Sequence, residues 1–286
     1  EENRAAGGHD HPLAGQIMGT SPETMAAGAE LLVGMNYDVI DVNLACPVKK
    51  IRKRHRGGHL LTVPDEAIAI LEAVREVVPA SIPLTVKMRR AFDETDEMSD
   101  NFERIFTAAY DMGCDWTTVH CRTVQQKYKG PGRWPFLKEL VKRHPEKLIF
   151  GSGDVWTVED IFLMLADTGV QGVSVARGCI GNPWIFRQAR SLMAGELPAP
   201  PTLLEQRQAL LDHFALSVKL HGEGSASRQM RKFGIKFSTH HPDPEKVRLR
   251  FIAVRSLSDW RAVLDEYYSE FSDQAADDEP PHADHH

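Results

Sequence analysis

The sequence predicts an α/β protein: a (β/α) barrel of the TIM type, followed by a small domain made of helices. Two observations point to the barrel. Six short apolar segments alternate with segments of helical periodicity, which is typical of a parallel sheet or barrel. Each apolar segment also ends in polar residues or glycine. A third observation, the proline-rich stretch at 197–201, marks where the alternation gives way to helices alone.

The elements of the barrel are expected in a regular order. Six strands are predicted at 13–19, 39–46, 84–89, 116–122, 148–154 and 172–178. Ser21-Pro22 predicts the start of the first helix, because serine caps helices and proline suits the first helical position. Apolar residues at helical spacing follow later strands at 67–78, 102–109 and 136–141. Thr157 and Asp160 have the spacing of a capping box, which would open a further helix.

The carboxyl ends of these strands carry the residues suited to chemistry. In a (β/α) barrel such ends meet on one face, where active sites lie. The residues expected there are Gln16, Asn43, Cys46, Lys87, Arg89, His120, Arg122, Gly153, Asp154, Arg177 and Gly178. One such strand end would mean little, but six together predict a site.

The most informative stretch runs from Val39 to Lys50. It indicates a buried strand that stops at Cys46-Pro47, and six of the eight residues at 49–56 are then basic. A possible acid or nucleophile therefore lies beside a loop suited to a polyanion. On the next strand, Lys87 stands in an apolar run, where a charge is costly unless it is paired. This predicts a functional lysine.

The stiff segment at 197–201 is the predicted domain boundary. The expected organisation is a flexible segment at 1–11, the barrel at 12–196, a helical domain at 202–271 and a disordered acidic tail at 272–286. Capping boxes at Thr202 and Ser256 open two helices of the helical domain. The chain has a net charge of -6, yet residues 219–261 contain ten Lys and Arg against four Asp and Glu. This basic region could contact phosphates.

Several classes of protein are disfavoured. No apolar run approaches the roughly 18 to 20 residues of a membrane span, and no signal peptide opens the chain. Four widely spaced cysteines without CxxC pairs favour reduced thiols and a cytoplasmic location. No metal site and no stable protein partner are expected, and His282, His285 and His286 are assigned to a flexible tail.

Several of these motifs occur together, in the same order, in one family. They are Asn43–Lys50, Thr85–Arg89, Val119–Gly130, Gly153-Asp154 and Arg177–Phe186. Together with Gln16, they make residues 13–187 resemble the tRNA-dihydrouridine synthases, with the B-type bacterial branch fitting best. The helical region that follows resembles the RNA-recognition domain of that family.

The resemblance implies an FMN enzyme that reduces a uridine of tRNA to dihydrouridine with NADPH as reductant. Cys46 would protonate uracil C5 while hydride from flavin N5 reaches C6. Lys87 would hold the flavin near its N1/O2 edge, Gln16 would bind its pyrimidine side, and His120 would lie near flavin and phosphate. The phosphate would be held by Ser152, Gly153, Asp154, Ala176 and Arg177. Contacts to tRNA would come from Asn43, Lys49, Lys50, Arg122, Arg228, Arg231 and Lys232.

Physical chemistry supports several of these roles independently. Reduced flavin carries negative charge near N1, which a fixed lysine stabilises electrostatically. Backbone N–H groups of glycine-rich turns suit a phosphate, and a thiol can act as a proton donor. A target base must leave its stack to reach the flavin, at a cost of a few kcal/mol. Basic residues at 49–56 and 228–236 could offset this cost through phosphate contacts.

The chain departs from the family pattern in two respects. The family usually has glycine, glycine, asparagine and glycine at the positions of Ala45, Cys121, Ser152 and Ala176. The family barrel also has eight strands, of which only the last six are found here, so the predicted barrel is N-terminally incomplete. Either about 45 to 55 residues before Glu1 complete the natural barrel, which the absent initiator methionine favours, or the barrel is a remnant.

Two other functions remain open from the sequence. One is an FMN barrel reductase of free pyrimidines, similar to dihydroorotate dehydrogenase. The basic helical domain argues against it, because a small substrate needs no such surface. The other is a non-catalytic RNA-binding relative whose truncated barrel no longer holds FMN. NADPH and NADH also cannot be distinguished, because the chain contains no Rossmann fingerprint.

Overall fold

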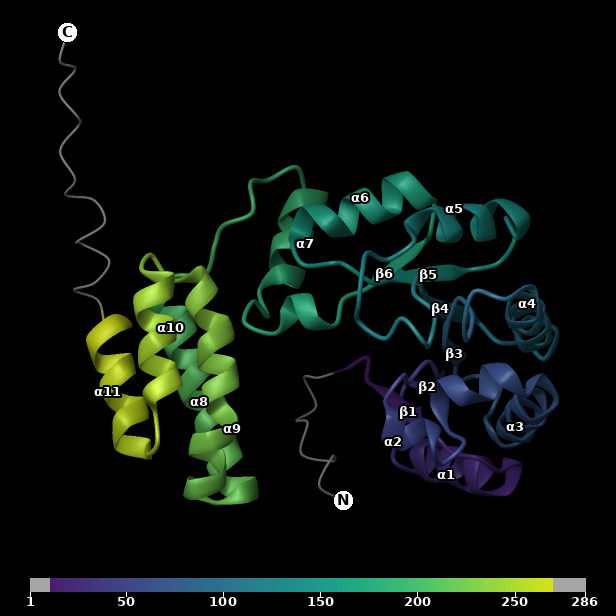
Figure 1. Cartoon of the computed structure of the whole chain (residues 1–286), viewed down its shortest axis with the longest axis horizontal. Helices are drawn as coiled ribbons and strands as arrows, with labels where there is room; N and C mark the ends of the chain where they lie inside the picture. The colour runs from purple at the N-terminus through teal and green to yellow at the C-terminus, as the bar shows by residue number, and fades with distance from the viewer. Residues whose placement is uncertain (1–10, 270–286) are drawn as a thin grey trace, which may run out of the picture. The chain divides into compact units, whose positions relative to one another are not determined.

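The computed structural model describes residues 11–269. The segment predicted to be flexible (apart from His11) and the predicted acidic tail lie outside the described residues. The described chain divides into two compact units, one made of residues 11–155 and 159–175, the other of 156–158 and 176–269 (Figure 1). The proline-rich segment at 197–201 lies within the second unit.

The first unit is built on a parallel sheet of six strands (Figure 1). These are β1 (Ala14–Ile17), β2 (Val39–Leu44), β3 (Leu84–Arg89), β4 (Trp116–His120), β5 (Ile149–Ser152) and β6 (Gly172–Ser174). Each strand pairs with the next one along the chain, which is the strand order of a (β/α) barrel. The predicted fold class is thereby confirmed.

A helix follows each of the first five strands and leads to the next strand. These helices are α1 (Pro22–Gly34), α3 (Pro64–Val77), α4 (Asp96–Asp111), α5 (Trp134–Arg143) and α6 (Val158–Thr168), with the short α2 (Lys49–Arg52) and η2 (Gly57–Thr62) before α3. The predicted start of α1 is confirmed, because Ser21 Oγ accepts a hydrogen bond from Thr24 N at 3.4 Å and Pro22 opens the first turn.

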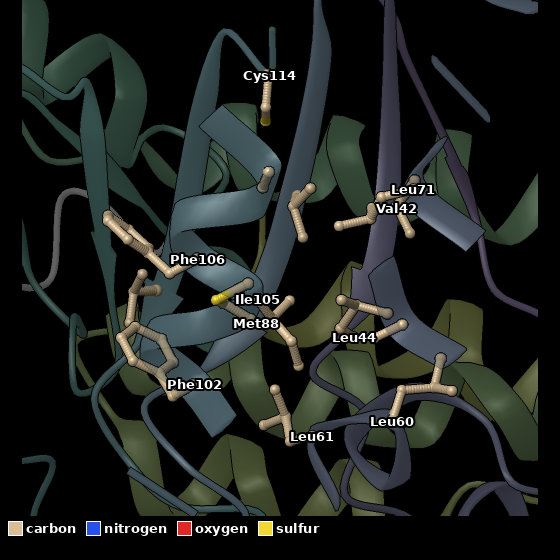
Figure 2. Close-up of a cluster of buried hydrophobic side chains, with 14 of the residues drawn as sticks. Val42, Leu44, Leu60, Leu61, Leu71, Met88, Phe102, Ile105, Phe106 and Cys114 are labelled. Carbon is tan, nitrogen blue, oxygen red and sulfur yellow. The ribbon is translucent and has the colours of Figure 1, made fainter. Parts of the chain in front are cut away.

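The hydrophobic core of this unit lies between the sheet and the helices. Alternate side chains of a strand point to opposite faces of the sheet. On the helix side, Val42, Leu44 and Met88 are fully buried in one cluster with Phe102 and Ile105 of α4, as Figure 2 shows. The other face of the sheet is thus left for polar side chains.

The sheet is curved, with its polar face on the concave side. Neighbouring strands lie about 4.8 Å apart, so in a flat sheet β3 and β6 would be separated by about 14 Å. Nevertheless, Lys87 Nζ on β3 donates to Ser174 Oγ on β6 at 3.5 Å. These two side chains could not meet across a flat sheet. Curvature therefore gathers the polar side chains as the inside of a barrel does.

The second unit is helical within the described residues. It contains η3 (Arg177–Cys179), α7 (Ile185–Met193), α8 (Leu203–His221), α9 (Glu223–Phe237), η4 (Ser238–His240), α10 (Pro244–Ala253) and α11 (Leu257–Tyr267). Its core includes the stacked rings of Phe214 and Trp260, whose centroids are 5.2 Å apart. The predicted capping boxes at Thr202 and Ser256 are both present, which confirms the starts of α8 and α11.

Three further features bear on the class of protein. None of the helices between residues 11 and 269 has both the length and the hydrophobicity that crossing a membrane requires. Within the same range, no group of three or more His, Cys, Asp or Glu side chains could hold a metal ion. All four cysteines are free; Cys114 and Cys121 are buried, whereas Cys46 and Cys179 are partly exposed.

Candidate active site

Strand register places several predicted site residues on the concave face. Paired residues of neighbouring parallel strands project from the same face of a sheet. Asn43 on β2 pairs with Lys87 on β3. Two residues beyond Lys87 on β3, Arg89 pairs with His120 on β4, and His120 pairs with Ser152 on β5. Four strands thus bring these side chains to the carboxyl end of one face.

A chain of hydrogen bonds links the first two strands. Gln16 Nε2 donates to Asp41 Oδ2 at 2.5 Å, and Asn43 Nδ2 donates to Gln16 Oε1 at 2.7 Å. Thr85 Oγ1 donates to the other carboxylate oxygen of Asp41 at 2.7 Å. The sequence prediction did not include Asp41 among the site residues. Its one signal was a carboxylate interrupting an apolar strand.

The segment that carries Cys46 is held on three sides. Ala45 N donates to Asn43 Oδ1 at 2.9 Å, and Ala45 O accepts from Arg89 Nε at 3.0 Å. Cys46 O accepts from Gly58 N at 3.1 Å. Gly57, at φ +58°, lies so close that an added Cβ would be 2.8 Å from Cys46 Cβ. The thiol, which is partly exposed, therefore projects from a fixed backbone.

Arg89 was expected at the site as a polar strand end, but no role was predicted for it. Its side chain is only 2% exposed. Nη1 donates to the carbonyl oxygens of Thr123 and Lys127, both at 2.8 Å. Burial lowers the pKa of Arg89 to about 10, so the guanidinium remains charged at neutral pH. It therefore joins the Cys46 segment to the loop after β4.

Lys87 and Asp41 carry opposite charges on the concave face, near enough for each to affect the pKa of the other. Burial lowers the pKa of Lys87, and the nearby Asp41 carboxylate opposes that shift. Burial likewise raises the pKa of Asp41, against hydrogen bonds from Thr85 and Gln16 and the charge of Lys87. Within residues 11–269, the one hydrogen bond of the Lys87 amine goes to Ser174. An amine has three donors, so this one can bind a further acceptor.

His120 is a neutral imidazole in this setting. Burial, reinforced by the charges of Arg89, Lys87 and Arg122, lowers its pKa to about 3. Its Nδ1 lies 3.2 Å from Arg122 N and accepts that backbone hydrogen. The ring proton must then be on Nε2. At neutral pH, His120 therefore offers a hydrogen-bond donor and no charge.

Arg122 and Asp154 form a partly buried ion pair between the ends of β4 and β5. Arg122 is 3% exposed, and its Nη2 lies 2.5 and 2.6 Å from the two carboxylate oxygens of Asp154. Arg122 also donates to Gly130 O, and Asp154 accepts from Gly132 N. The pair thereby organises the loop between α5 and β4. Contact of Arg122 with tRNA remains a prediction.

Two of the departures from the family pattern are accommodated by local structure. Cys121 is fully buried, and its Sγ lies where a Cβ on Gly153 would approach to 2.6 Å. Gly153, at φ +116°, both tolerates this turn and leaves room for the sulfur. Ala176 has φ −118°, a value open to any L-residue, so glycine is not needed there.

The remaining predicted residues belong to α2 of the first unit or to the second unit. Lys49 and Lys50 are exposed on α2, directly after the Cys46 segment. Ala176 and Arg177 belong to the second unit, where the Arg177 guanidinium lies 4.6 Å from the ring centroid of Trp156. On α9 of the same unit, Arg228 and Lys232 are exposed and Arg231 is half-buried. Within the first unit, the structure brings Gln16, Asn43, Lys87, His120 and Ser152 to one face of the sheet.

Comparison with known proteins decides the family. The family model described as dihydrouridine synthase matches residues 1–271. The chain belongs to the dihydrouridine synthase family. The resemblance inferred from the motifs is therefore confirmed, and Cys46, Lys87 and His120 are the residues of this chain that stand in those motifs.

Individual relatives of this chain agree with that assignment. A probable tRNA-dihydrouridine synthase of Treponema pallidum is 34% identical over 256 residues, covering 87% of this chain and 74% of the relative. A tRNA-dihydrouridine synthase B of Shewanella oneidensis is 32% identical, covering 89% and 77%. Among solved structures, a morphinone reductase in complex with tetrahydroNAD superposes with a TM-score of 0.44 and 15% identity, over 63% of this chain and 50% of that one.

Proposed function

We propose that this member of the dihydrouridine synthase family reduces a uridine of tRNA to 5,6-dihydrouridine, with FMN as its cofactor and NADPH as the reductant. Family membership and the names of the relatives support the substrate. One geometric observation carries the proposal. Arg89 ties the Cys46 segment to β3, the strand that also presents Lys87, and this supports a proton donor and a flavin-binding lysine at the same end of the sheet. The substrate bound at this face would be tRNA, and the protein would work in the cytoplasm.

The residues of the concave face fit FMN. When bound, FMN supplies the hydride that reduces the C5–C6 double bond of the base. Lys87 has donors to spare, and Arg122 Nη1 is buried without a hydrogen-bond partner in the described residues. Both cations suit an anionic group. Ser152 and Gly153 at the end of β5 would hold the phosphate, and His120 Nε2 would donate to an acceptor of the cofactor.

Cys46 is the proposed proton donor. Reduction of the base requires one proton at C5, and this proton would leave the Sγ–H bond of Cys46. The backbone on either side of Cys46 is fixed by bonds at Ala45 N, Ala45 O and Cys46 O. Such fixing keeps the thiol aligned with the base, which is how positioned groups contribute to rate.

Two basic surfaces are proposed to bind the tRNA backbone. Lys49 and Lys50 form one on the first unit, and Arg228, Arg231 and Lys232 form the other on α9. None of these five side chains makes an ion pair with another described residue. Their charges are therefore available to phosphates, and binding would release counterions.

The decisive experiment is the substitution Cys46→Ala. We expect the variant to bind FMN as the wild type does and to lose turnover almost completely, because only the proton donor is removed. Dihydrouridine in tRNA is measured by mass spectrometry, with free uracil as an alternative acceptor. Cys179→Ser, at the other partly exposed cysteine, is the control and should keep full activity. Wild-type dihydrouridine formation by Cys46→Ala, or reduction of uracil in preference to tRNA, would refute the proposal.

A further inference from the structure

The hydrogen-bond chain on β1 and β2 has a defined direction. It begins at a carboxylate, Asp41, which in its ionised form can only accept. Gln16 must therefore turn its NH2 group toward Asp41, which leaves Oε1 to accept from Asn43 Nδ2. Asn43 Oδ1 then accepts from Ala45 N, a backbone group that can only donate. Both ends of the chain enforce the same orientation.

The two ends act on different amides. Ala45 N fixes Asn43 directly, because a reversed Asn43 would point its NH2 at another donor. In this series of hydrogen bonds the Gln16 side chain has no backbone partner. Its orientation depends on Asp41 at one side and on Asn43 at the other. The bond to Asp41 is the stronger of the two, since its acceptor is charged.

We infer that Asp41 is a positioning residue that orients the Gln16 amide, so that the second N–H of its NH2 group is offered to a ligand at this edge of the concave face. Gln16 Oε1 accepts a hydrogen bond from Asn43. The Gln16 NH2 group donates one hydrogen to Asp41 and has a second hydrogen that takes no part in this series of bonds. The Gln16 side chain is exposed. The matching ligand atoms are a carbonyl oxygen or an unprotonated ring nitrogen.

The surroundings of Asp41 hold its carboxylate in place. Thr85, which is buried, donates to Oδ1, so Oδ2 is directed to Gln16. Burial raises the pKa of Asp41, but the Lys87 charge and the two donated hydrogen bonds favour the ionised form. The inference deepens the proposed function, on which the identity of the ligand as a flavin rests. The orientation of Gln16 does not depend on that identity.

The test compares Asp41→Asn with the wild type in the protein without cofactor. An amide at position 41 can offer Gln16 either an oxygen or an NH2 group, so Gln16 is no longer oriented from that side. Side-chain amide resonances are followed by ¹⁵N NMR, together with their hydrogen exchange. We expect exchange of the Gln16 NH2 to rise about tenfold, the scale expected for losing one charge-assisted hydrogen bond. Asn43 should change much less.

Asp115→Asn is the matched control. Asp115 accepts a hydrogen bond from Leu84 N at the opposite end of β3. The variant therefore removes a carboxylate from the same unit without changing the hydrogen bonds among Asp41, Gln16 and Asn43. Unchanged Gln16 resonances in Asp41→Asn, or equal changes in Asp115→Asn, would overturn the inference. If Asp41→Asn does not fold, Thr85→Val replaces it. Removing that hydroxyl should loosen Gln16, whereas Thr85→Ser should not, and a rigid Gln16 in Thr85→Val would refute the role of Asp41.

A second measurement connects the inference to ligand binding. FMN affinity, measured by quenching of flavin fluorescence, should fall about tenfold in Asp41→Asn. It should stay at the wild-type value in Asp115→Asn. The two hypotheses can fail separately: wild-type protein that makes no dihydrouridine would refute the proposed function, while the amide measurement, made without FMN or tRNA, would still decide the role of Asp41.

Discussion

The Arg89 guanidinium donates from Nε to Ala45 O at 3.0 Å and thereby holds the peptide that precedes Cys46. The same guanidinium binds two carbonyl oxygens of the loop after β4, those of Thr123 and Lys127. Three carbonyls around one planar cation define its position closely. The backbone that carries the Cys46 thiol is consequently held by a residue on the neighbouring strand.

Replacing Arg89 by lysine should separate charge from geometry. Arg89→Lys keeps the positive charge, but a single ammonium cannot reach three carbonyls in the geometry of a guanidinium. We expect dihydrouridine formation to fall by about 10- to 100-fold, since a misplaced catalytic group loses its alignment. The rate at which iodoacetamide alkylates Cys46 should also differ between Arg89→Lys and the wild type. Arg104→Lys, at an exposed ion pair with Asp65, should alter neither quantity.

A methyl group at position 57 should disturb Cys46 through contact. Gly57→Ala places a Cβ 2.8 Å from Cys46 Cβ, and Gly113→Ala places one in open space. Both glycines have positive φ, so both variants bear the left-handed backbone cost of about 1 kcal/mol. We expect both to lose stability in urea, with only Gly57→Ala losing activity. Equal activity in the two variants would contradict the prediction, because it would show that the position of Cys46 tolerates this contact.

The neutral state of His120 predicts how stability depends on pH. Its folded pKa of about 3 lies below the ordinary value of about 6.5, so the unfolded chain binds more protons between these pH values. The free energy of unfolding should fall as pH falls from about 6.5 toward 3, by up to about 1.4 kcal/mol per pH unit from this residue.

His120→Asn should make this dependence shallower. Asparagine keeps an acceptor near the position of Nδ1 for Arg122 N but does not titrate. Urea denaturation at several pH values measures the difference between variant and wild type. If the two slopes coincide, His120 titrates normally in the folded protein, and its assignment as a neutral donor is wrong.

Charge reversal on α9 should weaken tRNA binding and its salt dependence. In the double variant Arg231→Glu, Lys232→Glu, two cations that could contact phosphates become anions. The slope of log K against log salt should decrease by about 1 for each lost phosphate contact. Lys138→Glu, exposed on α5, serves as the control. An unchanged slope in the double variant would remove α9 from the tRNA interface.

The order of elements could be predicted from sequence because each signal is local. Apolar runs fix the strands, and the Ser21, Thr202 and Ser256 caps fix helix starts. Strand ends were predicted too late in five of six cases. Beyond β2, for example, Pro47 has no N–H for a ladder, and beyond β5, Gly153 turns at positive φ.

The supporting residues of the site could not be predicted in the same way. The bonds of Asp41 to Gln16 and Thr85 join three strands, so they depend on register, which no local pattern specifies. Arg122 shows the same difficulty. Its partner Asp154 is 32 residues away in sequence, and the sequence alone presented it as a cation available to tRNA.

The packing of Cys121 couples three sequence positions that look unrelated on paper. Its sulfur fills the space where side chains at 132 and 153 would begin, so a larger residue at 121 is compatible only with glycine at the other two. In a relative with glycine at position 121, a side chain at position 132 would not meet this sulfur. Substitutions at these positions should therefore be non-additive, and their order of acquisition during evolution would matter.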